Sequence, residues 1–238
     1  MPRYLLKLSG EALAGSQGFG IEVEFLKRVC DEIKQVRAAG VELAIVLGGG
    51  NLFRGQALAA AGLDRVVGDR MGMLATVMNG LACADFLQQA QVPARVFSAV
   101  PMPGVCAGYE RDAVIKALAA GEVAILAGGT GNPFFTTDTA ACLRGIEISA
   151  DAVWKATNVD GVYDADPRQN PAATRYTEVS YDEVLTQELG VMDLTAIVLC
   201  KEQQMPLVVF DLHTEGNLQR LAQGQEVGTR VVPASPPA

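Results

Sequence analysis

The sequence predicts an α/β fold, a three-layer sandwich whose central and mainly parallel sheet is flanked by helices. Short apolar runs of strand length alternate with longer segments of helical periodicity, which is the pattern of parallel strands connected by helices. Two of the strand-like runs are followed by glycine-rich loops, and open α/β sheets bind their ligands beyond the carboxyl ends of the strands. The 238 residues contain no evident repeat or linker, so we expect a single domain over residues 1–238.

The individual strands and helices are predicted from the spacing of apolar residues and from the positions of turn residues. Strands are predicted at 3–8, 41–47, 94–98, 123–127, 152–156 and 207–212, with a short edge strand at 228–232. The first helix has an apolar face of Phe25, Leu26, Val29, Ile33 and Val36 and ends at Gly40. Further helices are predicted at 65–89, near 110–120, near 137–146, after a capping box that begins at Ser180, and near 193–204.

Composition narrows the class of protein. The net charge of −8 argues against a nucleic-acid surface, which is normally basic. No apolar run approaches the roughly 20 residues of a membrane span, and the N-terminus has no signal-peptide pattern. The five cysteines form no C-x-x-C pair and are typical of reduced core residues, so we expect a cytoplasmic protein. With one histidine and no His/Cys cluster, a metal site built from protein side chains is not expected.

The most informative loop is residues 130–138, Thr-Gly-Asn-Pro-Phe-Phe-Thr-Thr-Asp, which follows the predicted strand 123–127 and two glycines. Its hydroxyls and amide are able to hydrogen-bond a sugar, a base or a phosphate, and Phe134 and Phe135 are able to wall a ring. The alternative is an ordinary strand-to-helix loop with two core phenylalanines.

Two further loops predict contacts with phosphate. Residues 48–55, Gly-Gly-Gly-Asn-Leu-Phe-Arg-Gly, expose backbone amides to an anion, and Arg54 supplies a fork of donors. Lys7 lies near the end of the first strand, where its apolar setting leaves two alternatives open, an anionic partner or a solvated position at the surface. Ser9 and Gly10 after it favour contact with phosphate. Neither the P-loop pattern nor G-x-G-x-x-G is present.

These features suit phosphoryl transfer, which requires positioning and charge neutralisation more than covalent chemistry. The candidate cations are Lys7, Arg54, Arg70 and Lys155, and the candidate acids are Asp69, Asp138, Asp166 and Asp193. No nucleophile–base pair is evident. A phosphate acceptor would need none, because a phosphate monoester is already largely dianionic at pH 7.

Six motifs of this sequence resemble those of the bacterial uridylate (UMP) kinases, in the amino acid kinase superfamily. They are KLSGEAL at 7–13, GGGNLFRG at 48–55, VVGDRMGMLATVMNGLA at 66–82, TGNPFFTTDTAACLRGIEI at 130–148, KATNVDGVYDADP at 155–167 and VMDL at 191–194. The resemblance runs from Tyr4 to about Val232. It implies the amino acid kinase fold and transfer of the ATP γ-phosphoryl group to UMP, giving UDP for pyrimidine nucleotide biosynthesis.

The resemblance also implies roles for particular residues. Lys7 and Asp138 are the expected catalytic residues, with Asp138 orienting Lys7. The expected ATP-binding residues are Lys7, Leu8, Ser9, Gly10, Gly50, Arg54, Thr157, Asn158, Tyr163 and Asp166. The expected UMP-binding residues are Gly49, Asp69, Thr130, Gly131, Asn132, Pro133, Phe134, Phe135, Thr136 and Thr137. The segment expected to be linked to a GTP effector is Gly15, Ser16, Gln17, Gly18, Phe19 and Gly20.

The family further implies Mg²⁺ carried with ATP, activation by GTP, inhibition by UTP and a homohexamer built as a trimer of dimers. Three residues stay open: Lys155 as a catalytic cation or a surface residue, Asp193 as a helix cap or a member of the charge network, and Arg70, where some relatives have histidine. Two other functions also stay open. One is a superfamily kinase whose acceptor forms an acyl phosphate, and the other is a non-catalytic nucleotide-binding or storage protein.

Overall fold

The computed structural model describes residues 1–53, 62–167, 169–170 and 172–233. The strands are β1 (Arg3–Leu8), β2 (Glu42–Leu47), β3 (Ala94–Ser98), β4 (Ala107–Gly108), β5 (Val123–Ala127), β6 (Ala152–Thr157), β7 (Glu178–Ser180), β8 (Leu207–Asp211) and β9 (Thr229–Val232). The α-helices are α1 (Gly10–Ala14), α2 (Val23–Ala38), α4 (Arg65–Gln89), α5 (Arg111–Ala119), α6 (Thr137–Glu147), α7 (Tyr181–Thr186), α8 (Leu194–Glu202) and α9 (Asn217–Ala222), and a 3-10 turn, η1, covers Gly15–Gln17.

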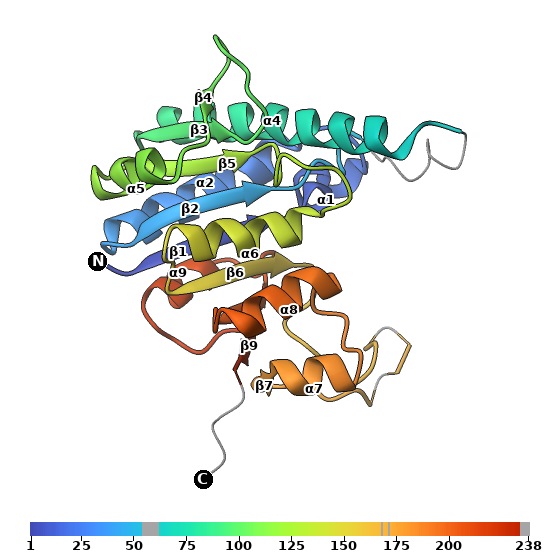
Figure 1. Ribbon diagram of the computed structural model, residues 1–238. Coiled ribbons are helices and arrows are strands. Elements are labelled where there is room, and N and C mark those ends of the chain that lie inside the picture. The colour runs from blue at the N-terminus through green and yellow to red at the C-terminus, as the bar shows by residue number, and fades with distance from the viewer. Residues whose placement is uncertain (54–61, 168, 171, 234–238) are drawn as a thin grey trace.

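In the described part of the chain the strands form one nine-stranded sheet in the order β4-β3-β5-β2-β1-β6-β8-β9-β7. Every pairing is parallel except that of β8 with β9. The predicted mainly parallel α/β sheet is therefore confirmed. The carboxyl ends of the central strands point to one side of the molecule, on the right in Figure 1, where the loops after β1, β2 and β5 gather.

Helices cover both faces of the sheet and make the predicted three layers. Helices α2, α4 and α9 pack on one face, and α5, α6, α7 and α8 on the other (Figure 1). The strands are therefore buried on both sides, and their successive apolar side chains point alternately into the two cores. In β2, for example, Leu43 and Ile45 point to one core and Ala44 and Val46 to the other.

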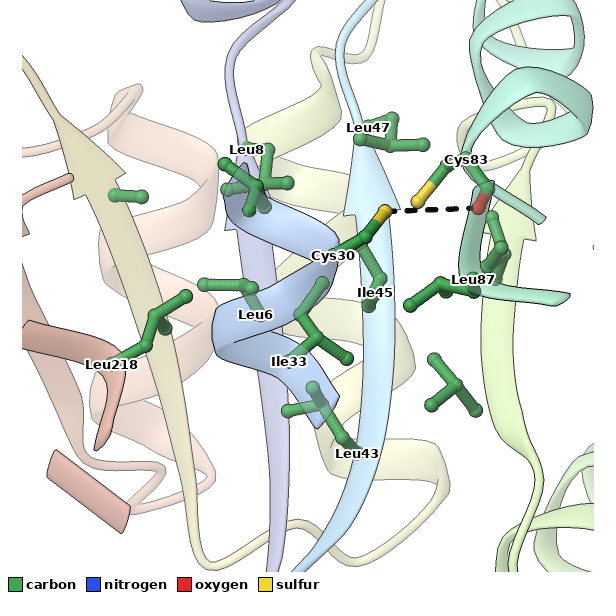
Figure 2. Packing of buried hydrophobic residues seen from close by; sticks show 14 of the residues in the cluster. Leu6, Leu8, Cys30, Ile33, Leu43, Ile45, Leu47, Cys83, Leu87 and Leu218 are labelled. Carbon is green, nitrogen blue, oxygen red and sulfur yellow. Dashed lines mark hydrogen bonds between the residues drawn. The ribbon is translucent and has the colours of Figure 1, made fainter. Parts of the chain in front are cut away.

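The first of these cores is built by α2 against β1 and β2. Figure 2 shows Ile33 of α2 between Leu6 and Ile45, with Leu87 of α4 beside them. The Cys30 thiol also lies in this layer, 4.0 Å from the Cys83 carbonyl oxygen. All five cysteines are free thiols, as the sequence predicted.

The predicted elements lie within one or two residues of those observed, and the Ser180 capping box is present at the start of α7. One prediction was wrong. The strand near 228–232 is not at the edge, because β9 pairs with β8 on one side and β7 on the other. The short elements α1, η1, β4, β7 and α9 could not be predicted, because they have too few residues for a periodic signal. No helix in the described residues is long and apolar enough to cross a bilayer.

Candidate active site

A buried cluster of three charges lies at the carboxyl ends of β1 and β6. The two strands pair in parallel with Lys7 directly opposite Lys155. Like charges facing each other across a sheet are destabilising unless an anion separates them. Asp138, at the start of α6, supplies that anion: its Oδ1 lies 2.7 Å from Lys7 Nζ and its Oδ2 lies 2.7 Å from Lys155 Nζ.

The cluster decides two alternatives that the sequence left open. Lys7 is only 7% exposed and is held by Asp138, so the interpretation of Lys7 as a solvated surface residue is wrong. Lys155 is not a surface residue either, because its ammonium contacts Asp138 and also donates to the Val191 carbonyl. Two ammoniums on one carboxylate leave a net positive charge, which attracts phosphate.

Burial and charge act on the cluster in opposite directions. Burial alone would raise the pKa of Asp138, but the attraction of Lys7 and Lys155 prevails and holds that pKa below its ordinary value. Burial lowers the pKa of Lys155, and the positive charge of Lys7 lowers it further, while Asp138 opposes both effects. Asp138 Oδ1 meets Lys7 as an ion pair without an aligned hydrogen bond. The carboxylate therefore stays ionised at neutral pH.

A cavity of about 320 Å³ opens between α4 and the loop that ends in α6. Among the predicted UMP residues, Gly49, Asp69, Thr130, Asn132, Phe135, Thr136 and Thr137 line it. Gly50, predicted to bind ATP, lines it too. The remaining lining residues were not predicted from the sequence, and they are Phe53, Arg65, Gly68, Gly72, Met73, Thr76 and Gly129. Phe134 and Phe135 are 64% and 49% exposed, so the interpretation of this loop as one with two core phenylalanines is wrong.

Asp69 of α4 closes one side of this cavity. Its Oδ2 accepts a hydrogen bond of 2.7 Å from the Phe134 backbone N–H, and its Oδ1 lies 2.9 Å from Arg65 Nε. Phe134 has a φ of 72°, in the left-handed region that side chains disfavour. The bond to Asp69 helps to hold that conformation, so Asp69 shapes the loop as well as facing the cavity.

The glycines after β2 serve close packing as well as anion access. A Cβ on Gly48 would lie 2.6 Å from Gly10 N, and one on Gly49 would lie 2.8 Å from the Gly72 carbonyl of α4. A Cβ on Gly10 would in turn lie 2.5 Å from Gly50 N. Gly48 and Gly49 are therefore required for the close packing of the loops after β1 and β2 against each other and against α4. From the sequence, these glycines were expected to serve phosphate binding alone.

Two side-chain amides connect these loops to segment 15–20. Asn51 donates to the Gly20 carbonyl at 2.8 Å, and its backbone carbonyl accepts from Gly20 N at 3.0 Å. Asn79 of α4 donates to Asn51 Oδ1 and to the Gly48 carbonyl, each at 2.7 Å. A displacement of α4 would therefore reach segment 15–20 through two buried amides.

A second cavity, of about 520 Å³, adjoins the charge cluster, because Lys155 lines it. Of the predicted adenosine residues, Thr157, Tyr163 and Asp166 line this cavity. Asn158 is exposed and lies outside the lining. The facing wall is the segment from Gln187 to Val191, which the sequence analysis missed because it carries no distinctive side-chain chemistry.

The remaining predicted residues have other surroundings. Leu8 is fully buried in the core, and the Ser9 hydroxyl accepts from Ala12 N as the cap of α1. Arg70 is exposed on α4 and lines neither cavity. Arg54 lies outside the described residues.

Asp193 is a helix cap, and among the described residues it forms no ion pair with Lys7 or Lys155. It accepts from Ala196 N at the start of α8, and its carboxylate also binds the hydroxyls of Thr136 and Thr139. Thr136 in turn caps α6, because its hydroxyl accepts from Asp138 N at 3.1 Å. Asp193 thus orders the turn that carries the catalytic candidate Asp138.

The fold and the site together describe a phosphotransferase of the α/β class, and the comparisons with known proteins agree. The chain matches the amino acid kinase family over residues 2–211. It is 58% identical over 227 residues to the uridylate kinase of Pseudoalteromonas atlantica, covering 95% of this chain and 92% of that one. It is also 58% identical over 233 residues to the uridylate kinase of Alcanivorax borkumensis, covering 97% and 92%.

A solved structure gives the same result. The crystal structure of UMP kinase from Bacillus anthracis superposes with a TM-score of 0.95 at 36% sequence identity, covering 99% of this chain and 98% of that chain. The chain therefore belongs to the amino acid kinase family and, within it, to the uridylate kinases.

Proposed function

We propose that this protein is a UMP kinase that transfers the γ-phosphoryl group of ATP to UMP and forms UDP, in the synthesis of pyrimidine nucleotides. The observation that carries the proposal is the Lys7–Asp138–Lys155 cluster, whose Lys155 lines the cavity of about 520 Å³ and whose Asp138 follows Thr137, a lining residue of the cavity of about 320 Å³. An anionic donor and an anionic acceptor must meet for this reaction. Paired ammoniums at the meeting point offset their repulsion and stabilise charge on the transferred group.

UMP is assigned to the cavity of about 320 Å³ between α4 and the 130–137 loop. There Thr130 and Asn132 offer hydrogen-bonding groups to the uracil edge, and Phe135 offers an aromatic wall. Asp69 is suited to accept hydrogen bonds from ribose hydroxyls, as acidic residues do in dinucleotide sites. Gly131, Pro133, Phe134, Thr136 and Thr137 complete the assigned loop, and Gly49 faces the same cavity.

ATP is assigned to the other side, with its base and ribose in the cavity of about 520 Å³ near Thr157, Asn158, Tyr163 and Asp166. Its phosphates extend toward Lys7 along the backbone of Leu8, Ser9, Gly10 and Gly50, with Arg54 assisting. This direction is supported by Lys155, which lines the ATP cavity and also contacts the carboxylate that holds Lys7. Asp138 orients both ammoniums.

A divalent metal accompanies ATP in this family of reactions, and we assign it as Mg²⁺. The described residues contain no group of three or more His, Cys, Asp or Glu side chains that could hold a metal ion. Asp138 is occupied by two ammoniums. The ATP phosphates are therefore the ligands that would carry Mg²⁺, which when bound neutralises phosphate charge.

A stripe of exposed apolar residues on α4 supports an oligomer. Val67, Met71, Leu74, Met78 and Leu81 recur at intervals of four and three residues, which places them on one face of the helix. Apolar faces of this kind mark interfaces between subunits. We assign this face to the dimer contact of a homohexamer, a trimer of dimers.

GTP activation and UTP inhibition are proposed together with the oligomer. Segment 15–20 is the assigned effector-linked segment, and its support is the pair of amides, Asn51 and Asn79, that connects it to α4 and to the glycine loop. A contact that moves α4 would thereby change the glycine loop, whose Gly49 and Gly50 line the cavity assigned to UMP. Activation requires that GTP bind the active arrangement more tightly, with couplings of about 1–3 kcal/mol typical of allostery.

The test is a coupled assay of nucleoside diphosphate formation with ATP and Mg²⁺, using UMP, CMP, dUMP, aspartate and acetylglutamate as acceptors. UMP should be the preferred acceptor, since a site built to bond one base edge leaves polar groups unpaired with another. Equal turnover of CMP and UMP would contradict the assignment. Turnover of an amino acid would support a carboxylate kinase, and binding without turnover would support a storage protein.

A further inference from the structure

A buried arginine lies directly behind the loop assigned to UMP. Arg144 is on α6, is 7% exposed, and takes no part in the charge cluster described above. Its guanidinium donates toward the Thr130 carbonyl at 3.4 Å and to Glu147 Oε2 at 2.7 Å. The guanidinium carbon also lies over the Tyr109 ring, 3.8 Å from its centre.

The three side chains of Arg144, Tyr109 and Glu147 form one closed unit. The Tyr109 hydroxyl donates to the same Glu147 oxygen that receives Arg144. Burial and the bond to Glu147 raise the pKa of Tyr109, so its hydroxyl remains a donor across the physiological range. The carboxylate balances the guanidinium, and the ring covers one of its faces. These contacts hold the guanidinium in place, with a donor on its Nη2 directed at the Thr130 carbonyl.

Thr130 is the point at which this unit meets the loop. The Thr130 hydroxyl accepts from Asn132 N at 3.1 Å and forms a tight turn, so its backbone position also sets that of Asn132. Both residues line the cavity assigned to UMP. Gly131 between them has a φ of 81° and fits closely against Ala99, where a Cβ would lie 3.3 Å away. The loop is therefore held from behind at two neighbouring residues.

The same unit reaches a second segment of the chain. Tyr109 follows β4, and its backbone N–H donates to the Ser98 carbonyl at 2.9 Å. Arg144 thus links the segment after β4 and the helix α6 to the Thr130 turn. Simple space filling would need neither a charge nor a donor at this position.

We propose that Arg144, oriented by Tyr109 and Glu147, is a positioning residue that sets the Thr130 turn for recognition of the uracil edge. The proposal rests on the assignment of UMP to this cavity. Because Arg144 touches the loop and not the charge cluster, it should affect UMP affinity and choice of base, and leave ATP affinity and phosphoryl transfer nearly unchanged.

The test compares Arg144→Lys with Tyr109→Leu and Tyr109→Phe. Lysine keeps the charge but cannot stack on the ring and bond two acceptors in one plane. We expect Arg144→Lys and Tyr109→Leu to raise KM for UMP about tenfold, equivalent to about 1.4 kcal/mol, with KM for ATP changed by less than about twofold. Tyr109→Phe keeps the ring and should have an intermediate effect. The preference for UMP over CMP should fall most in Arg144→Lys and Tyr109→Leu and less in Tyr109→Phe.

A matched control is available on β3. Arg95 also lies over an aromatic ring, 5.9 Å from the centre of Phe97, and pairs with a glutamate, Glu122, at 2.6 Å. It has no contact with the loop assigned to UMP among the interactions described, so Arg95→Lys should leave both KM values unchanged. Thermal unfolding of every variant separates loss of stability from loss of UMP binding.

Three outcomes would overturn the proposal. One is an equal rise in KM for UMP and ATP, and another is a lower Tm for Arg144→Lys with KM for UMP unchanged, since either is the result of general structural support. The third concerns the double variant Arg144→Lys with Tyr109→Leu. If its effect on KM for UMP equals the sum, in free energy, of the two single effects, the residues act independently, whereas members of one unit should be non-additive. If calorimetry shows that the wild-type protein does not bind UMP, the assignment of the cavity fails first and the proposal fails with it.

Discussion

Replacing Asp138 with asparagine should separate the structural and catalytic parts of the charge cluster. The substitution keeps the shape of the side chain but leaves two ammoniums, each now 2.7 Å from a carboxylate oxygen, without their anion. Breaking a buried ion pair in this way costs about 3–5 kcal/mol. For a chain of this size each kcal/mol lowers Tm by roughly 2–4 °C, so Tm should fall by roughly 6–20 °C.

Turnover should fall as well, by about 10²-fold or more, because Lys7 loses the group that orients it toward the transferred phosphate. The double variant Asp138→Asn with Lys155→Met tests the cause. Removing the second ammonium relieves the repulsion between the lysines, so the double variant should be more stable than Asp138→Asn alone while remaining as inactive. Calorimetry or circular dichroism gives the stability, and a coupled assay gives the turnover.

ATP with Mg²⁺ should stabilise the single variant as well, because phosphate oxygens can take the place of the missing carboxylate. At 100 times its Kd a ligand adds about 2.7 kcal/mol to the stability of the protein that binds it. Two results would refute the reasoning: near-normal turnover of Asp138→Asn in a folded protein, or a double variant that is less stable than the single one.

Three further predictions concern the site and the surface. Asp69→Asn should raise KM for UMP about tenfold and leave KM for ATP nearly unchanged, because a charged acceptor facing the assigned UMP cavity is lost; separate titrations check this, and equal changes in both constants would contradict it. Burial lowers the pKa of Lys155, so this side chain loses its proton at a lower pH than an ordinary lysine. Turnover should fall as the pH rises through that pKa. Lys155→Arg should move that alkaline limb upward, since arginine stays protonated, and a pH–rate profile with an unmoved limb would exclude Lys155 as its source. Met78 is 58% exposed on α4, so Met78→Glu should dissociate the oligomer in sedimentation velocity, and a wild-type protein that sediments as a monomer would remove the interface.

The long elements of the fold could be predicted from the sequence because their signals are local. The range of α4, Arg65–Gln89, agrees with the predicted 65–89, and β3 and β5 also agree residue for residue. A strand buried on both faces is continuously apolar, and a glycine with positive φ follows the ends of α2 and α5, so neither signal needs information from distant residues. The loop at 130–138 and the glycines after β2 could be recognised for the same reason, since their chemistry is unusual in a contiguous stretch.

Pairing between distant segments could not be predicted in this way. β9 was expected at an edge, but three residues of β7 pair beside it, and so short a strand has no period to detect. The glycines after β2 looked like an anion site, yet Gly48 and Gly49 also serve contacts with Gly10 and α4 that depend on how the layers pack.

The sequence by itself therefore determined the class of fold, the loops that carry the chemistry and the family resemblance. Only the tertiary structure decided that Lys155 lies opposite Lys7, because strand register joins positions 148 residues apart in the chain. It likewise brought Asp138 between the two ammoniums and Arg144 behind Thr130. The physical reason is that charge and hydrogen-bonding act over a few ångströms in space, and residues far apart in sequence come within that range only after the hydrophobic core has set the positions of the strands and helices.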